Sequence, residues 1–167
     1  AGAAREPFGL APLDWKPMPD LNRILAAREP LTLASLPRGS LPLVLADLAR
    51  AAKRRAVFIA PDDAAMRAAA EAARFFAPEI EVIAFPAWDC LPYDRASPAL
   101  SISAERLAAL HKLQQPGAAQ QLLVTTVNAV LQRVLTPFRV RESVREFRVG
   151  TTIGHESLAA LLVRQGY

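Results

Sequence analysis

Short apolar runs alternate with amphipathic stretches along most of this chain. The runs Ala56–Ala60, Glu81–Phe85 and Leu122–Thr126 have strand length and are rich in Val, Ile, Leu and Phe. A further candidate strand, the first in chain order, is Leu31–Leu36, with the sequence LTLASL. Each run is followed by a helical pattern, an order typical of parallel strands joined by helices. We therefore predict an α/β fold with a parallel sheet flanked by helices.

The spacing of apolar residues predicts the helices. They are expected over residues 21–28, 43–52, 62–76, 102–113, 128–134 and 155–165. Asp62 is the expected N-cap of the third helix, while Thr136 and Pro137 are expected to end the fifth. In the fourth, the pattern places the leucines inward and Glu105, Arg106 and Lys112 outward.

The pattern divides the chain into three parts. Residues 1–21 are proline-rich without a sustained period, so we expect an N-terminal arm or leader. Residues 22–137 hold the α/β pattern and form the predicted first domain. In residues 138–167 apolar positions alternate with arginines, which is typical of strands with one solvated face. We expect this part to be the beginning of a smaller α+β domain that lacks its remaining strands.

Composition excludes several classes of protein. With 52% hydrophobic and 22% charged residues the chain is neither disordered nor unusually polar. One cysteine cannot form an internal disulfide, and with only two histidines it offers no structural zinc site. No apolar run reaches the roughly 18 to 20 residues of a membrane span, and no secretory signal is recognisable, so we expect a cytoplasmic protein. The net charge of +4 is small for a domain that mainly binds phosphates.

The turn between the first predicted strand and its helix is where a phosphate-binding loop would lie. Such a loop reads G-x-x-x-x-G-K-[ST], because its lysine neutralises the terminal phosphates and its hydroxyl holds magnesium. Here the turn consists of Pro37, Arg38, Gly39, Ser40, Leu41 and Pro42. Leu41 occupies the lysine position and Pro42 the hydroxyl position. We therefore expect a degenerate phosphate loop, with no catalytic residue, cofactor or metal in this chain.

Other candidate groups have simpler structural explanations. Asp62 and Asp63 could pass for a magnesium-binding pair after a strand, but helix capping accounts for Asp62. Cys90 and His111 could form a nucleophile and base, yet no oxyanion donor or orienting residue follows from their spacing. His155 is expected to be a solvated residue in a first helical turn.

The loop after the third predicted strand, PAWDCLPYDRASP, is dense in proline and aromatic residues. Trp88, Leu91 and Tyr93 could stack on bases, but we expect them to pack and to hold the path of the loop. A rival hypothesis is a small enzyme with its site at the strand carboxyl ends, near Pro61, Pro86–Tyr93 and Thr126.

Clustered arginines are the main candidate for partner binding. Arg139, Arg141, Arg145 and Arg148 are predicted to line one face of a strand pair, partly neutralised by Glu142 and Glu146. This face is either a solvated surface or a docking surface for an acidic protein. Direct DNA binding through it and through residues 53–55 is a further alternative.

Several passages together resemble the N-terminal region of bacterial transcription-repair coupling factor, Mfd. The most selective are FPAWDCLPYDRASP, the helix ISAERLAALHKL and the segment LLVTTVNAVLQRV. The earlier units LTLASLPRGSLPLVLADLAR and VFIAPDDAAMRAAAEAARFFAP fit the same region. The likeness covers residues 31–167 and implies a first domain like that of the repair subunit UvrB, a helicase-like fold without a working phosphate loop. The DNA-wedging hairpin of UvrB is missing here, since Tyr93 leads directly to the helix at Ile102.

The resemblance implies a recruitment module rather than an enzyme. In the family a separate motor uses ATP and magnesium to move on DNA and push stalled RNA polymerase, and none of that motor is in this chain. The N-terminal module recruits UvrA, mainly through its second small domain, and also packs against other domains of the full-length protein. The resemblance implies that the UvrA-contacting residues lie mostly in the second small domain, beyond residue 167, so no contact residue is carried over to a position here. No membrane contact is implied.

Overall fold

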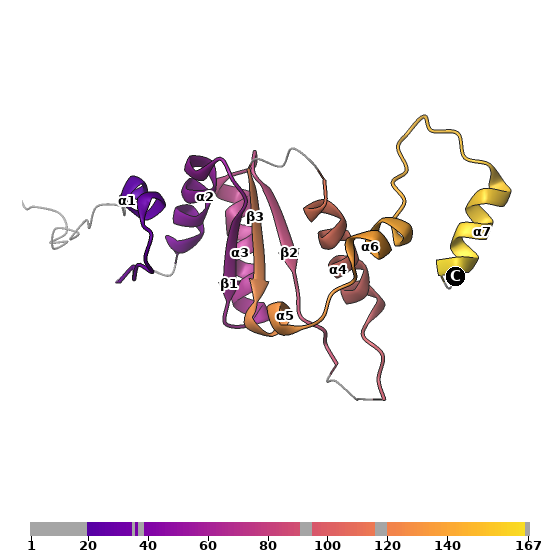
Figure 1. Ribbon diagram of the computed structural model, residues 1–167, viewed down its shortest axis with the longest axis horizontal. Coiled ribbons are helices and arrows are strands. Elements are labelled where there is room, and N and C mark those ends of the chain that lie inside the picture. The colour runs from indigo at the N-terminus through magenta and orange to yellow at the C-terminus, as the bar shows by residue number, and fades with distance from the viewer. Residues whose placement is uncertain (1–19, 35, 37–38, 91–94, 116–119, 166–167) are drawn as a thin grey trace, which may run out of the picture.

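A parallel sheet of three strands forms the centre of the computed structural model, which describes residues 20–34, 36, 39–90, 95–115 and 120–165 (Figure 1). The strands are β1 (Ala56–Ala60), β2 (Glu81–Phe85) and β3 (Gln121–Thr126), in the order β1-β3-β2. The parallel register places Val57 beside Leu123 and Ile83 beside the same residue. The predicted α/β class and these three strands are therefore confirmed.

Seven helices lie in the part of the chain that the structure describes. They are α1 (Leu21–Ala26), α2 (Leu41–Ala52), α3 (Asp63–Phe76), α4 (Leu100–Leu113), α5 (Val127–Leu131), α6 (Pro137–Ser143) and α7 (His155–Gln165). The predicted cap of α3 is confirmed, because the Asp62 carboxylate accepts a hydrogen bond of 2.8 Å from the backbone N–H of Ala65. Figure 1 shows α7 after an extended segment, away from the sheet.

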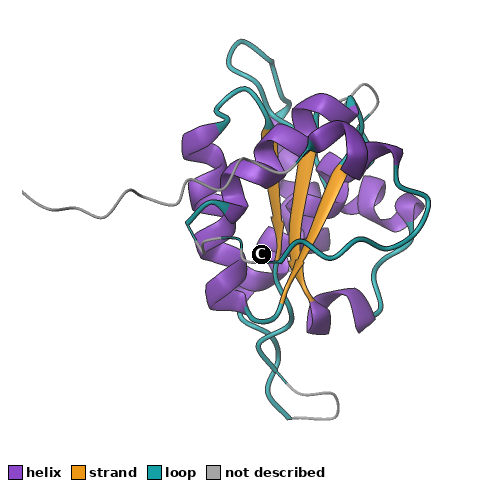
Figure 2. Cartoon of the chain, turned by 90° about the vertical axis from the view of Figure 1, so that its left-hand side faces the viewer, coloured by secondary structure: helices purple, strands orange, loops and turns teal. Residues whose placement is uncertain are grey.

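Helices cover the two faces of the sheet unequally (Figure 2). On one face α2 and α3 pack through alanines and Met66, which is fully buried, and small side chains bring these helices close to the strands. On the other face Ala109 of α4 and Ala129 of α5 pack against Ile83 and Phe85. This second layer covers β2 and β3, whereas Val57 and Ile59 of β1 stay about half exposed on that side.

The segment Leu31–Leu36 is not a strand, so that prediction is wrong for the five residues described within it. Residues 31–34 and 36 have no regular secondary structure, and Leu31 and Leu33 are exposed. A strand is stabilised mainly by its cross-strand neighbours. Among the described residues β1 pairs only with β3, so residues 31–34 and 36 have no neighbouring strand. The alternating leucines are therefore insufficient to form a strand here. Ser35 lies outside the described residues.

The segment that follows α5 also departs from its prediction. Thr136 and Pro137 were expected to end a helix, but they begin α6: the Thr136 hydroxyl accepts from the N–H of Arg139 at 3.4 Å, and Pro137 is the first helical residue. A threonine cap and an N1 proline favour helix initiation at this point. Val140 is completely buried, and residues 144–149 contain no strand. The prediction of strands from alternating apolar and arginine residues is thus wrong.

Removing the cap of α3 should destabilise the protein measurably. We expect Asp62→Ala to lower the free energy of unfolding by about 1 kcal/mol, because the N–H of Ala65 loses its acceptor at the helix start. Asp63→Ala, which removes a neighbouring acid that does not cap, is the matched control and should cost less than about half as much. Urea unfolding of both variants measures the difference, and equal losses would contradict the capping role.

Candidate functional site

The carboxyl ends of the three strands share one edge of the sheet, where α/β proteins usually bind ligands. Two buried threonines end β3 there, and both of their hydroxyls engage the backbone. The Thr125 hydroxyl donates to the Phe85 carbonyl at 2.9 Å, and the Thr126 hydroxyl accepts from the N–H of Ala129 at 3.2 Å. These hydroxyls fasten β2 and α5 to the sheet, so nothing in this pair favours the rival enzyme site near Thr126.

A buried arginine fills the same edge. Arg106 of α4 is 2% exposed, and its guanidinium carbon lies 4.3 Å from the ring centroids of both Phe85 and Trp88. Its Nη1 donates to the Pro86 carbonyl and to Gln132 Oε1, the latter at 3.0 Å. Among the described contacts, this cation lies between two aromatic faces and donates to neutral oxygens, which stabilise it.

Burial has a cost for this cation. It lowers the pKa of the Arg106 guanidinium below its ordinary value, and Nε finds no hydrogen-bond partner among the residues that the structure describes.

The start of the loop after β2 is held by the same glutamine, because the N–H of Trp88 donates to Gln132 Oε1 at 3.0 Å. Asp89 accepts from the N–H of Ala99 at 3.1 Å, which ties the two described ends of that loop together. Trp88 is partly buried and packs against Arg106, as predicted; Leu91 and Tyr93 lie outside the described residues.

The prediction that Arg106 points outward is wrong. A usable signal was present, because Ile102, Arg106 and Ala109 share one helical face and Ala109 is buried. The charge of the side chain favoured a surface position. The two aromatic rings that contact Arg106 belong to the end of β2 and to the loop after it, so the sequence of α4 does not reveal them.

The turn before α2 is the segment that the sequence analysis interprets as a degenerate phosphate loop. Leu41 and Pro42 are the first two residues of α2, and the ring of Pro42 is buried. Proline supplies no N–H to a phosphate at this helix start. Gly39 and Ser40 form the turn itself, while Pro37 and Arg38 lie outside the described residues.

The remaining sequence candidates do not assemble into a reactive centre in the described part of the chain. His111 Nε2 lies 3.0 Å from Glu146 Oε1 and 2.9 Å from Gln115 Nε2, and no described contact joins it to Cys90. His155 is exposed at the start of α7. The described residues include no group of three or more His, Cys, Asp and Glu side chains placed to hold a metal ion. None of the described helices is long and apolar enough to cross a membrane.

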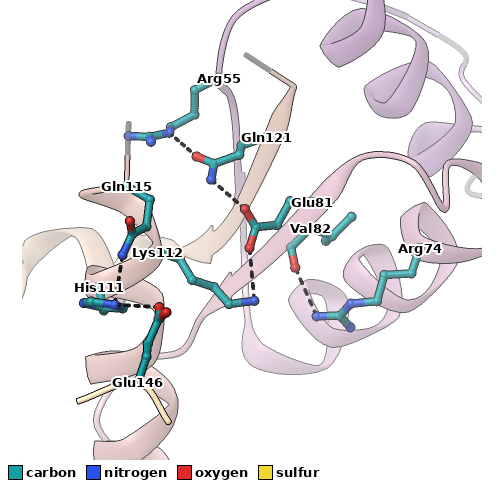
Figure 3. A network of polar contacts seen from close by, with 9 residues as sticks. All are labelled: Arg55, Arg74, Glu81, Val82, His111, Lys112, Gln115, Gln121 and Glu146. Atoms are coloured by element: carbon teal, nitrogen blue, oxygen red, sulfur yellow. Dashed lines mark hydrogen bonds and ion pairs between the residues drawn. The ribbon is translucent and has the colours of Figure 1, made fainter. Parts of the chain in front are cut away.

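A polar network links the amino ends of the strands (Figure 3). Gln121, which is 1% exposed, accepts from Arg55 Nε at 2.9 Å and donates to Glu81 at 2.7 Å. Lys112 of α4 pairs with the same Glu81 carboxylate at 3.1 Å. The hydrogen bond from Gln121, helped by Lys112, lowers the pKa of Glu81. Arg55 also donates to the Leu113 carbonyl, so this arginine links the start of β1 to the end of α4.

The four arginines of the candidate docking face do not lie on a common strand. Arg139 and Arg141 belong to α6, whereas Arg145 and Arg148 lie in the irregular segment after it. All four are exposed. Neutralisation is partial, since Arg139 and Arg148 approach Glu142 and Glu146 at 3.5 Å. The hydrogen bond from His111 lowers the pKa of Glu146 and ties this segment to α4 (Figure 3).

Comparison with known proteins gives one consistent relationship. The chain is 37% identical over 132 residues to the transcription-repair-coupling factor of Myxococcus xanthus, a match that takes in 74% of this chain and 11% of that protein. It is 30% identical over 87 residues to the transcription-repair-coupling factor of Haemophilus influenzae, with 52% of this chain and 7% of that protein covered. No family model matches the chain. The chain is thus distantly homologous to a segment of these factors and spans about a tenth or less of their length.

Truncating Trp88 tests its packing role. We expect Trp88→Ala to lower the free energy of unfolding by about 3 kcal/mol, because the Arg106 cation loses one of its two aromatic faces and a void opens at the sheet edge. Phe75→Ala, at a ring that is 80% exposed, is the control and should change stability by less than about 0.5 kcal/mol. Full stability of the Trp88 variant in urea unfolding would show that the ring serves another purpose.

Acid titration tests the network at the other edge. In the folded protein the pKa of Glu81 lies below its ordinary value of 4.5. The ionised carboxylate therefore contributes its full stabilisation above pH 4.5, and this stabilisation is lost as the pH falls through the pKa of the folded state. We expect Glu81→Gln to reduce the loss of stability between about pH 5 and pH 3. Glu71→Gln, at an exposed acid of α3 that makes none of the described ion pairs, should leave that loss unchanged. Identical acid profiles for the wild type and Glu81→Gln in urea unfolding would rule the linkage out.

Proposed function

We propose, from its homology to a segment of transcription-repair-coupling factors, that this chain is a non-catalytic scaffold module of such a factor. In this proposal it helps to recruit the damage-recognition subunit UvrA to stalled RNA polymerase during nucleotide excision repair. The match of 132 residues to the Myxococcus xanthus factor is the observation that carries the proposal. ATP turnover and movement on DNA belong to motor domains outside this chain.

The start of α2 supports a module without its own nucleotide chemistry. A helicase-like domain binds triphosphate through a lysine and a hydroxyl at the helix that follows its first strand. At the turn predicted as the phosphate loop, α2 begins with Leu41 and Pro42, an isobutyl side chain and a buried ring, and the described residues before it form no strand. At the strand ends, the hydroxyls of Thr125 and Thr126 are engaged with the backbone. Both features favour a degenerate helicase-like domain that has kept its shape for binding.

The exposed arginines of α6 and the following segment are the proposed contribution of this chain to docking. Arg139, Arg141, Arg145 and Arg148 outnumber the acids among them, Glu142 and Glu146, and all six side chains are exposed. Cations of this kind on a surface direct the approach of an acidic partner more than they add to affinity. In this proposal UvrA also contacts the remainder of the second domain, and RNA polymerase and DNA bind other domains of the full-length factor.

Capture of purified UvrA by the immobilised chain tests the proposal. We expect binding that weakens as salt rises and that falls at least about tenfold when Arg139, Arg141, Arg145 and Arg148 are replaced by glutamate, because the partner surface is acidic. Arg28→Glu with Arg54→Glu, at exposed arginines of other segments, is the matched control and should bind normally.

Two outcomes would count against the scaffold role. One is the absence of UvrA binding at micromolar concentrations by a chain that circular dichroism shows to be folded. The other is ATP hydrolysis by the purified chain that Leu41 or Pro42 substitutions abolish, since a module of this kind has no nucleotide site there.

A further inference from the structure

An unusual density of exposed apolar side chains marks residues 127–138. Within these twelve residues six large apolar side chains are 48–79% exposed: Val127, Val130, Leu131, Val134, Leu135 and Phe138. We refer to these six as the apolar strip. They belong to α5, to the connection after it, and to the start of α6 (Figure 1). Single exposed apolar residues are ordinary, but a concentration of this kind marks an interaction surface.

The backbone that carries the apolar strip is held firmly from within. Ala129 and Val140, at its two ends, are completely buried. Gln132, in its middle, holds Arg106 and the N–H of Trp88. Thr126 caps α5 and Thr136 caps α6. The large side chains therefore face solvent from an anchored segment, and exposure is not a consequence of poor packing.

The charged residues within the segment that carries the apolar strip all have the same sign. Residues 127–141 contain Arg133, Arg139 and Arg141, each of them exposed, and no aspartate or glutamate. The first acid, Glu142, lies 3.5 Å from Arg139 and neutralises only that cation in part. Exposed apolar side chains interspersed with exposed arginines suit a protein partner that offers apolar side chains together with acids.

We infer that the apolar strip and its three arginines form a docking surface for an acidic amphipathic helix of a partner protein. This inference rests on the proposed docking function and adds the chemistry of the occupant. A helix with apolar residues at i, i+3, i+4 and i+7 presents the matching stripe, and glutamates beside that stripe meet the arginines.

Other occupants fit the surface less well. Nucleic acid is bound through phosphate contacts, and the six aliphatic or aromatic side chains of the apolar strip offer none. Insertion into a membrane surface needs one continuous amphipathic helix lying in its plane. Here the apolar strip bends through two short helices, of 5 and 7 residues, that are separated by an irregular connection.

A pair of designed peptides tests the inference on the intact chain. The probe is a helical peptide of about 18 residues with leucines at i, i+3, i+4 and i+7 and glutamates on both flanks; its matched partner has lysine in place of each glutamate. We expect the acidic peptide to bind at least about tenfold more tightly than the basic one by calorimetry, because the charged residues of the surface are basic. Its amide shift perturbations in NMR spectra should centre on residues 127–141.

Variants of the surface complete the test. Leu131→Asp with Phe138→Asp should weaken the acidic peptide at least about tenfold, while Leu100→Asp with Phe75→Asp, at side chains 88% and 80% exposed, should leave it unchanged. Circular dichroism verifies that each variant is folded. Equal binding of the two peptides, binding insensitive to the Leu131 and Phe138 changes, or a preference for anionic vesicles over the acidic peptide would overturn the inference.

The capture of UvrA separates this inference from the proposed function. A chain that captures UvrA but does not discriminate between the peptides would overturn the docking surface and leave the scaffold role standing. A chain that selects the acidic peptide through residues 127–141 but does not capture UvrA would support the surface and contradict the assignment to UvrA.

Discussion

The contact of Arg106 with two aromatic rings is the interaction on which the second layer of this protein depends. Its guanidinium lies between Phe85, at the end of β2, and Trp88, in the loop that follows. Gln132 binds the same guanidinium and the Trp88 N–H, so α4, the loop and the segment after α5 share one anchor. In the part of the chain that the structure describes, the rings and the neutral oxygens around this cation are what stabilise it.

The two edges of the sheet are organised by opposite means. At the amino ends, ion pairs and amide hydrogen bonds around Gln121 join β1, β2, β3 and the end of α4. At the carboxyl ends, where α/β proteins commonly bind ligands, the polar groups of Thr125, Thr126 and Arg106 are directed into the protein. These polar groups are thus engaged within the fold, whereas exposed apolar side chains and arginines lie on α5, α6 and the segment that follows.

Much of the fold follows from the local sequence, and the failures share a physical cause. β1, β2, β3, the Asp62 cap and the bounds of α7 were predictable, because buried strands and capped helices depend on local patterns. Leu31–Leu36 has a strand pattern, but strand formation needs a partner that the pattern cannot supply. Thr136 and Pro137 suit a helix start as well as an end, and only the buried position of Val140 distinguishes the two. The anchoring role of Arg106 depends on rings far away in the sequence. The half-exposed face of β1 depends on which strands the helices cover, which the local pattern does not reveal.

We propose that this chain acts by docking and not by nucleotide chemistry. Hydrogen exchange of the chain, measured alone, with purified UvrA and with magnesium and an ATP analogue, compares the two directly. We predict slower amide hydrogen exchange over residues 127–148 when UvrA is present, and no change over residues 39–52 when nucleotide is present. Slower exchange at the start of α2 with nucleotide, together with no response of residues 127–148 to UvrA, would contradict this proposal.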